Sequence, residues 1–272
     1  MIIPLRVQCH LQIESAQACH CVAMLRPRSG YAQWLSQETY RFSPWVHTTE
    51  YVDQFGNLCQ RFDAPAGRLD IDVDAIVATE AEIALAINLP PTPIEAVPDS
   101  VMEFLLPSRY CPVDRVGSRA LDIAGQYIEG SAQVEAIRYW INQNIHYEYG
   151  RSDASTDAMD TLYNGAGVCR DFAHVGMMLC RSLLIPARMV VGYLHRLEPM
   201  DLHAWFEAYI DGRWYTVDAT QAVPTGGRVV LGYGRDAADV AFLTSYGQIT
   251  TTAMTIRVEQ LDQGGLARQA DY

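Results

Sequence analysis

Positive charge is scarce in this sequence, where 20 Lys and Arg residues stand against 32 Asp and Glu residues and give a formal net charge of −12. Binding to nucleic acids or to anionic membranes relies on clustered Lys and Arg, so the sequence argues against both kinds of partner. Apolar runs are short, and none approaches the ~20 residues needed to cross a bilayer. Residues 1–14 alternate polar and apolar side chains, unlike a secretory signal. We therefore expect a cytoplasmic protein.

Regularly paired cysteines are also missing. The seven cysteines are odd in number and irregularly spaced along 272 residues, which does not fit a disulfide framework. Cys9, Cys19 and Cys21, with His10 and His20 beside them, lack the C-x₂₋₄-C pairs of structural zinc sites. We expect free thiols in a reducing compartment and no bound metal.

The first part of the chain has the pattern of a β domain. Period-two alternation and turn residues predict short strands over residues 3–13, 19–25, 37–42, 47–53, 58–62 and 69–77. Prolines then cluster between residues 88 and 100, where neither a helix nor a central strand can continue. We predict an N-terminal antiparallel, β-sandwich-like domain over residues 1–95 and a second domain, with the C-terminal strands, over residues 96–272.

The second part of the chain combines helices and strands. Apolar residues recur at helical spacing over 116–127 and 131–145, and a third helix begins near Cys169 and stops before Pro186. Strand patterns follow at residues 188–194, 203–210, 214–220 and 249–260. Helices followed by antiparallel strands are typical of an α+β fold.

One cysteine stands where a thiol gains reactivity. A glycine-rich loop over residues 165–167 ends just before the helix that begins at Cys169. The positive end of a helix dipole and its unpaired N–H groups stabilise a thiolate, and the same N–H groups suit a developing oxyanion. The alternative is a small buried hydrophobe, which is the usual role of a cysteine.

A histidine and an aspartate meet across a predicted hairpin. Asp211-Gly212 is a two-residue hairpin signal, and the resulting register pairs Ile210 with Arg213 and matches the apolar faces of both strands. In that register Asp218 lies diagonal to His203 on the same face, within reach of a long side chain. A histidine oriented by a carboxylate is what nucleophilic catalysis needs, although a structural hydrogen bond would give the same pattern.

Four motifs, in order between residues 147 and 220, resemble the core of the transglutaminase-like superfamily: GVCRDFAH, IPARMVVGYL, HAWFEAYI and GRWYTVDAT. The segment YVDQFGN at residues 51–57 is similar to the β domain that precedes this core in bacterial members. The resemblance implies a papain-like fold with a catalytic triad of Cys169, His203 and Asp218. It also implies acyl transfer from an amide, without a metal or an organic cofactor.

Four further residues are candidates for the cleft around this triad. Arg170 follows the nucleophile where the family pattern usually has a neutral or amide residue, and adds positive charge there. By position in that pattern, Tyr147 and then Tyr149 would hold the oxyanion, with amphipathic packing as the alternative. Trp205 would shield the Asp–His pair from water or simply pack in the core.

Three functions fit these residues. The first is a cysteine peptidase or amidase acting on a peptide or protein substrate, with water as the acyl acceptor. The second is a protein-glutamine transglutaminase with an amine acceptor, because the sequence does not reveal which acceptor the cleft admits. The third is a non-catalytic binding module that retains the fold, which the presence of all three catalytic residue types disfavours. The sequence predicts no oligomeric state.

Overall fold

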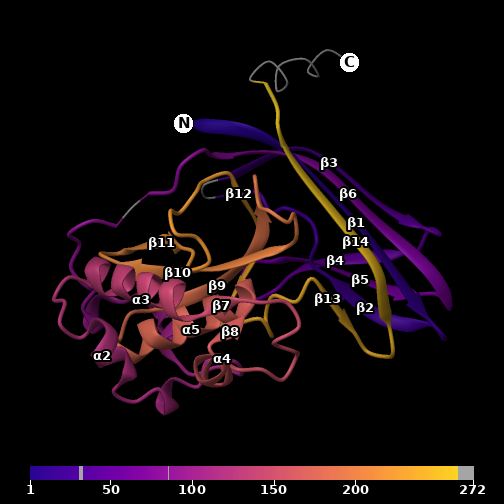
Figure 1. The fold of residues 1–272 in the computed structure, drawn as a ribbon. Coiled ribbons are helices and arrows are strands. Elements are labelled where there is room, and N and C mark those ends of the chain that lie inside the picture. Colours follow the sequence, from indigo (N-terminus) through magenta and orange to yellow (C-terminus); the bar gives the residue numbers. More distant parts are fainter. Residues whose placement is uncertain (31–32, 85, 263–272) are drawn as a thin grey trace.

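The computed structural model describes residues 1–30, 33–84 and 86–262, which form a β unit and an α+β unit. In Figure 1 the β unit lies on the right and the α+β unit, with its helices, on the left. The predicted α+β fold with an N-terminal antiparallel β part is confirmed.

The outer sheet of the β unit contains the longest strands, in the order β14-β1-β6-β3. These strands are β1 (Ile2–Ser15), β3 (Gln33–Ser43), β6 (Gly67–Glu80) and β14 (Thr250–Gln260). In β1 and β6, apolar side chains at every second position are buried, so each strand has one core face and one solvent face.

A second sheet, in the order β13-β2-β5-β4, packs against the buried face of the first. Its strands are β2 (Cys19–Ala23), β4 (Thr48–Val52), β5 (Leu58–Ala64) and β13 (Leu243–Ser245). Strands β4 and β5 form a hairpin in which Val52 lies opposite Leu58, so the loop between them is longer than a two-residue turn. Leu11, Ile71 and Phe62 belong to the core that both sheets share.

The last two strands that the structure describes join the N-terminal ones. Strand β14 pairs with β1, and β13 pairs with β2. The predicted division at residue 95 puts the C-terminal strands in the second domain, so their pairing differs from that expectation. A strand's alternation shows which face is buried but not which distant strand it will pair with. The division near residue 95 remains a prediction.

The α+β unit is built on a third antiparallel sheet, in the order β11-β10-β9-β12. Its strands are β9 (Ala187–Leu194), β10 (His203–Ile210), β11 (Arg213–Val217) and β12 (Arg228–Gly234). The α-helices are α1 (Asp99–Met102), α2 (Arg119–Ala124), α3 (Gly130–Asn144), α4 (Ala158–Asn164) and α5 (Cys169–Ser182). Short 3₁₀ turns occupy Ile94–Ala96, Glu103–Leu105 and Val113–Arg115, and β7 (His146–Tyr147) pairs in parallel with β8 (Ala166–Gly167).

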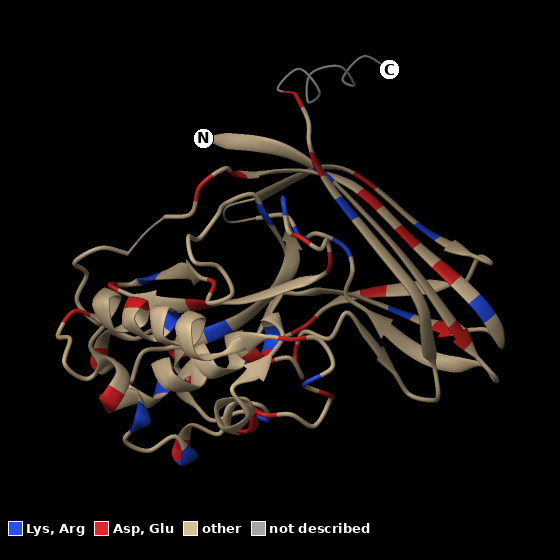
Figure 2. Ribbon diagram, in the orientation of Figure 1, with Lys and Arg blue, Asp and Glu red and all other residues tan. Residues whose placement is uncertain are grey.

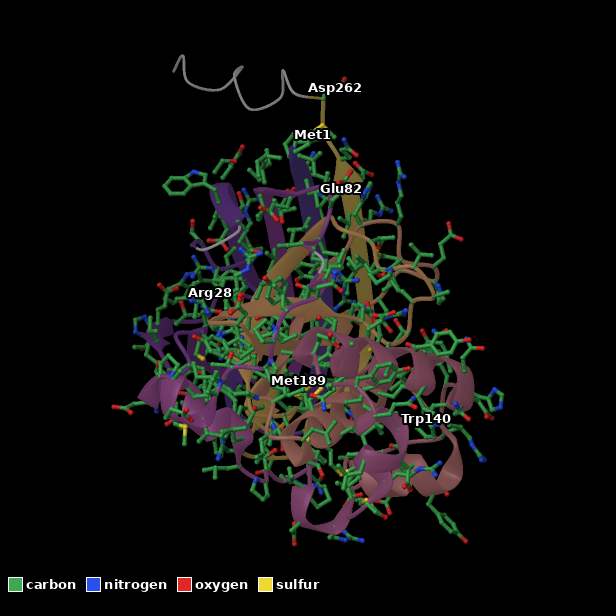
Figure 3. All side chains as sticks on the ribbon, turned by 90° about the vertical axis from the view of Figure 1, so that its left-hand side faces the viewer. Met1, Arg28, Glu82, Trp140, Met189 and Asp262 are labelled. Carbon is green, nitrogen blue, oxygen red and sulfur yellow. The ribbon has the colours of Figure 1, made fainter. Side chains whose placement is uncertain are left out.

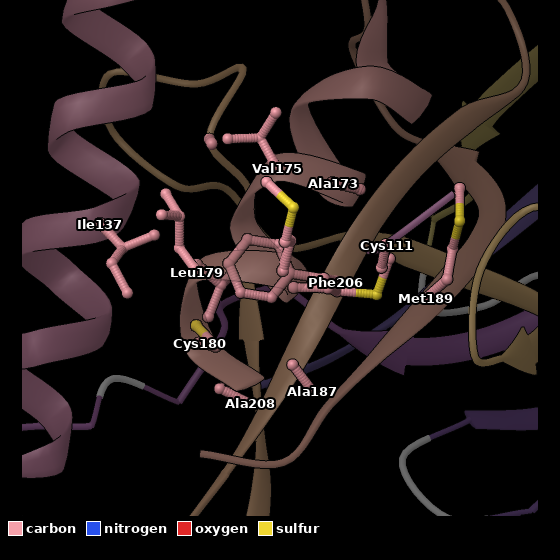
Figure 4. Packing of buried hydrophobic residues seen from close by; sticks show 14 of the residues in the cluster. Cys111, Ile137, Ala173, Val175, Leu179, Cys180, Ala187, Met189, Phe206 and Ala208 are labelled. Atoms are coloured by element: carbon pink, nitrogen blue, oxygen red, sulfur yellow. The ribbon is translucent and has the colours of Figure 1, made fainter. Parts of the chain in front are cut away.

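Helix α5 is the central element of this unit. Its residues from Asp171 to Arg181 are all buried, because one side packs on β10 and the others are covered by α2, α3 and α4. Phe206 of β10 lies among side chains of α5 in Figure 4, close to Val175 and Leu179. This packing joins the start of α5, where Cys169 lies, to the strand that carries His203.

Charged residues recur along the long strands of the outer sheet, and several acidic segments follow one another on β6 (Figure 2). Arg6 on β1 pairs with Asp74 on β6, and His10 pairs with Asp72. These contacts are exposed and contribute little to stability. None of the described helices has the length and hydropathy needed to span a bilayer.

Candidate active site

The thiol of Cys169 lies at the first residue of α5. The carboxylate of Asp171 accepts a hydrogen bond from the backbone N–H of Val168 at 2.9 Å, which caps the helix one residue before the thiol. Gly167 leaves room for this contact, because a Cβ there would stand 2.7 Å from the Cβ of Asp171. Cys169 is half-buried, whereas the other six cysteines are buried, and all seven are free thiols.

A short parallel pair of strands brings Tyr147 to the thiol. In this pair Tyr147 of β7 lies opposite Gly167 of β8, two residues before Cys169. Burial, the charge of Cys169 and a hydrogen bond with Tyr149 raise the pKa of the Tyr147 hydroxyl, and a hydrogen bond from the backbone N–H of Cys169 opposes them. A phenol that stays protonated beside this N–H group is placed to donate to an oxyanion.

The hairpin register confirms the pairing expected from Asp211-Gly212. Ile210 pairs with Arg213, and Phe206 pairs with Val217. Asp211 and Gly212 have φ values of 46° and 80°, which a two-residue turn between right-twisted strands requires. This register places Asp218, which follows the last paired residue Val217, next to His203.

His203 and Asp218 are in direct contact. The Nε2 of His203 lies 2.7 Å from the Oδ2 of Asp218, and both side chains are buried. Because Nε2 faces the carboxylate, Nδ1 is left for the thiol of Cys169, which also hydrogen-bonds with the imidazole. The structure therefore brings Cys169, His203 and Asp218 together in one line of contacts.

The charges along this line favour a protonated imidazole. Burial by itself lowers the pKa of His203, but hydrogen bonds with Asp218 and Cys169 outweigh it and raise the pKa to about 9. For Asp218 burial acts in the opposite sense, yet its contacts with His203, Arg228 and Thr220 lower its pKa below the ordinary value. At neutral pH the pair is an imidazolium and a carboxylate.

Two residues that the sequence did not single out complete the environment of Asp218. The Oδ1 of Asp218 accepts from the backbone N–H of Thr220 at 3.0 Å and from its hydroxyl at 2.7 Å. The Nη2 of Arg228 donates to Oδ2 at 2.9 Å. An aspartate two residues before a threonine is a recognisable local turn signal. Arg228 has no such signal, because it lies ten positions further on in β12, which was not predicted.

The other two predicted cleft residues near the thiol, Arg170 and Tyr149, have different contacts. The guanidinium of Arg170 donates to the carboxylate of Asp171 at 3.0 Å and to the carbonyl oxygen of Asp153 at 2.8 Å. It thus ties the start of α5 to a neighbouring loop. Tyr149 stands edge-on to Tyr147, with 5.5 Å between ring centroids, and is 55% exposed. These two tyrosines give the surface beside Cys169 an aromatic character.

Trp205 is buried behind the histidine. Its ring stacks on the ring of His203, with 6.0 Å between centroids, and the guanidinium of Arg228 lies 4.9 Å from the Trp205 ring centroid. This position excludes water from one side of His203, and core packing accounts equally well for the same contacts.

Comparison with known proteins places the chain in a family. A model of the transglutaminase-like superfamily matches residues 119–219, and a model of the bacterial transglutaminase-like N-terminal region matches residues 14–78. An uncharacterized protein of Mycobacterium leprae is 32% identical over 233 residues, covering 80% of this chain and 83% of that protein. The chain belongs to the transglutaminase-like superfamily. The crystal structure of a candidate cysteine protease from Cytophaga hutchinsonii matches this transglutaminase-like chain with a TM-score of 0.91 and 32% identity, covering 96% of this chain and 92% of that one.

This transglutaminase-like site has the parts that acyl transfer requires. It combines a thiol at a helix start with an imidazolium held by a buried carboxylate, and two hydrogen-bond donors stand next to the thiol. Nucleophile, proton donor and oxyanion donors are the minimum set for covalent catalysis on a carbonyl.

Proposed function

We propose that the protein is a thiol-dependent acyl-transfer enzyme that acts on peptide or side-chain amides, as a cysteine peptidase or amidase. The observation that carries this proposal is the contact line from half-buried Cys169 through His203 to Asp218. The family and the candidate protease among its relatives support the same class of reaction. A peptide or protein is the proposed substrate, and nucleic acids and membranes are not proposed as partners.

The proposed reaction begins with attack of the Cys169 thiolate on an amide carbonyl carbon. The carbonyl oxygen gains a negative charge, which the backbone N–H of Cys169 and the hydroxyl of Tyr147 stabilise. The imidazolium of His203 then gives its Nδ1 proton to the departing nitrogen, and the C–N bond breaks to leave a thioester. Asp218 holds the ring throughout, and its negative charge supports the imidazolium.

The second half of the reaction releases the acyl group. A water molecule attacks the thioester while neutral His203 takes its proton. The C–S bond then breaks, which gives the acid and restores the Cys169 thiolate beside the His203 imidazolium. A primary amine in place of water would give a new amide, which is the transglutaminase reaction. Water is the proposed acceptor. We also propose that the enzyme works where thiols stay reduced, as in the cytoplasm, because all seven cysteines are free.

Iodoacetamide alkylation tests the nucleophile directly. Six of the seven cysteines are buried, so the label reports on Cys169, and Cys169→Ala supplies the blank. At pH 6 we expect wild type to react roughly tenfold or more faster than His203→Ala, because the imidazolium stabilises the thiolate. His47→Ala, an exposed histidine of the β unit, is the matched control and should behave as wild type. Equal rates for wild type and His203→Ala would sink the proposal.

Acyl acceptors are then separated with a peptide library and a labelled primary amine. Peptide cleavage or deamidation without amine incorporation supports a hydrolase. Amine incorporation that depends on Cys169 would instead establish the transglutaminase reaction and replace water as the proposed acceptor.

A further inference from the structure

Strand β12 lies at the edge of its sheet, with β9 as its only strand partner in the described sheets. Its other edge is bound by side chains of the β unit. The hydroxyl of Thr79 donates to the carbonyl oxygen of Arg228 at 2.8 Å. The amide of Gln33 donates to the carbonyl oxygen of Val230 at 2.9 Å and accepts from its N–H at 2.7 Å.

Asn57 makes the same kind of contact further along. Its amide donates to the carbonyl oxygen of Tyr233 at 2.6 Å and accepts from the N–H of Tyr233 at 2.8 Å. Gln33, Asn57 and Thr79 are all buried. Together these three residues, which we call the β12 clamp, provide the hydrogen bonds that a neighbouring strand would otherwise make.

The β12 clamp is itself fixed within the β unit. The amide of Gln33 also donates to the carbonyl oxygen of Arg28 at 2.5 Å. Asp53 accepts from the side-chain amide of Asn57 at 2.9 Å and from its backbone N–H at 2.8 Å. The YVDQFGN segment therefore shapes a loop that presents Asn57 to β12.

The first residue of β12 is Arg228, which contacts the triad. Its Nη2 lies 2.9 Å from the Oδ2 of Asp218, the same oxygen that faces His203. The Nε of Arg228 donates to the carbonyl oxygen of Thr225 at 2.9 Å, and Nη2 also contacts Gln221. Contacts thus run without a gap from the β unit through β12 to the catalytic histidine.

We propose that Arg228 is a positioning residue of the triad and that the β12 clamp of the N-terminal β unit sets its place. This inference rests on the proposed acyl-transfer function. Arg228 holds the carboxylate of Asp218 in the orientation that His203 needs. It also shares the negative charge on Oδ2, so His203 releases its proton more readily to a leaving amine than it would beside Asp218 alone.

The first experiment measures the proton affinity of His203 in the full chain by NMR of isotope-labelled histidine, with His203→Gln to assign the signal. Arg228→Met removes the positive charge beside the Asp218 carboxylate. The proton affinity of His203 should therefore rise about tenfold, and its titration should move to higher pH. Arg228→Lys keeps the charge, so its His203 titration should lie close to that of wild type. An unchanged His203 titration in folded Arg228→Met overturns the role of Arg228.

The second experiment breaks the β12 clamp without touching the triad. The double variant Gln33→Ala/Asn57→Ala should shift the His203 titration in the same direction as Arg228→Met, because it loosens the hold of Arg228 on Asp218. Gln12→Ala is the control, because Gln12 makes its contacts within the outer sheet. If the His203 titration shifts in Arg228→Met but not in the double variant, the claim that the β12 clamp sets the place of Arg228 is overturned.

These readouts separate the two proposals. If alkylation of wild type does not depend on His203, the acyl-transfer function fails. The His203 titration would still report whether Arg228 and the β12 clamp act on the Asp–His pair.

Discussion

His203 keeps its proton because specific contacts outweigh its burial. A buried imidazole in an apolar setting loses its charge readily, and here the carboxylate at 2.7 Å reverses that tendency. The carboxylate is held in turn by four hydrogen bonds, from His203, Arg228 and both donors of Thr220. These donors keep Asp218 ionised and fixed in position when the charge on the Cys169 sulfur changes.

This arrangement predicts a pH-dependent contribution of His203 to stability. Its pKa rises from an ordinary 6.5 to about 9 on folding, so the added stability is fully present below about pH 6.5 and is lost as the pH rises through about 9. Each pKa unit is worth about 1.4 kcal/mol, which makes the effect on the order of 3 kcal/mol. Urea unfolding at pH 6 and pH 10 checks this. The difference in free energy of unfolding between wild type and His203→Gln should be smaller at pH 10 than at pH 6.

The exposed His47→Gln variant serves as the control and should track wild type at both pH values. A difference between wild type and His203→Gln that stays constant from pH 6 to pH 10 would mean that the Asp–His contact does not govern the proton of His203.

The meeting of Cys169, His203 and Asp218 was predictable because each of these residues has a local signal. Cys169 follows a glycine-rich loop at a helix start, and the turn at Asp211-Gly212 sets the register between His203 and Asp218. Arg228 was missed because its partner is brought close only by the fold of the β9–β12 sheet.

Helix α5 and strand β10 must approach each other closely for the thiol to reach the imidazole. Gly176 allows this approach, because a Cβ at that position would lie 2.3 Å from Cε1 of Phe206. The ring of Phe206 lies against the helix in the space that a side chain would occupy (Figure 4). The distance between these two elements is therefore set by one small and one large residue.

Gly176→Ala should destabilise the protein by about 1–3 kcal/mol, because overpacking forces the helix and strand apart. It should also lower the alkylation rate of Cys169, since the helix carries the thiol. Thermal or urea unfolding measures the first effect. Phe206→Leu in the Gly176→Ala background should recover part of both losses, and Phe206→Leu alone completes the cycle. Additive effects of the two substitutions would show that this contact does not set the helix position.

Most elements of the fold could be read from periodicity. The strand predicted at residues 203–210 is β10 (His203–Ile210), and the helix predicted from 131 to 145 is α3 (Gly130–Asn144). Strand β12 was not predicted, because its sequence VVLGYG has no alternation of polar and apolar residues. Its residues are buried by the β unit as well as by their own sheet. Helix α4 was not predicted, because its seven residues are too few to show the spacing of apolar residues that marks a helix.

At the scale of the whole molecule, β14 brings a late segment of the described chain back to the first strand. Figure 3 shows Met1 and Asp262 together at the same end of the protein, and Leu261 donates its N–H to the carbonyl oxygen of Pro4. Strand β14 thereby covers the free edge of β1, and Ile256 contributes to the core of the β unit. The order of strands in a sheet depends on such contacts between distant segments, which is why the sequence did not predict it.

Ile256→Asp should lower the free energy of unfolding by more than about 2 kcal/mol, because it places a charge in this core. The β12 clamp joins the two units, so the triad should be lost in the same transition as the outer sheet. Circular dichroism and Cys169 alkylation, followed along one urea titration, would check this. Thr255→Asp, on the exposed face of the same strand, should change little. Two separate transitions for the two signals would contradict the link between the units.

The return of β14 to the first strand also bears on how the protein is made. About 170 residues of synthesis separate the end of β6 at Glu80 from the start of β14 at Thr250, which takes a ribosome roughly 10–30 s at the usual pace of translation. Throughout that time β1 has an unpaired edge, the kind of surface that invites pairing with other chains. The outer sheet is thus begun before the α+β unit is synthesised and completed only after it.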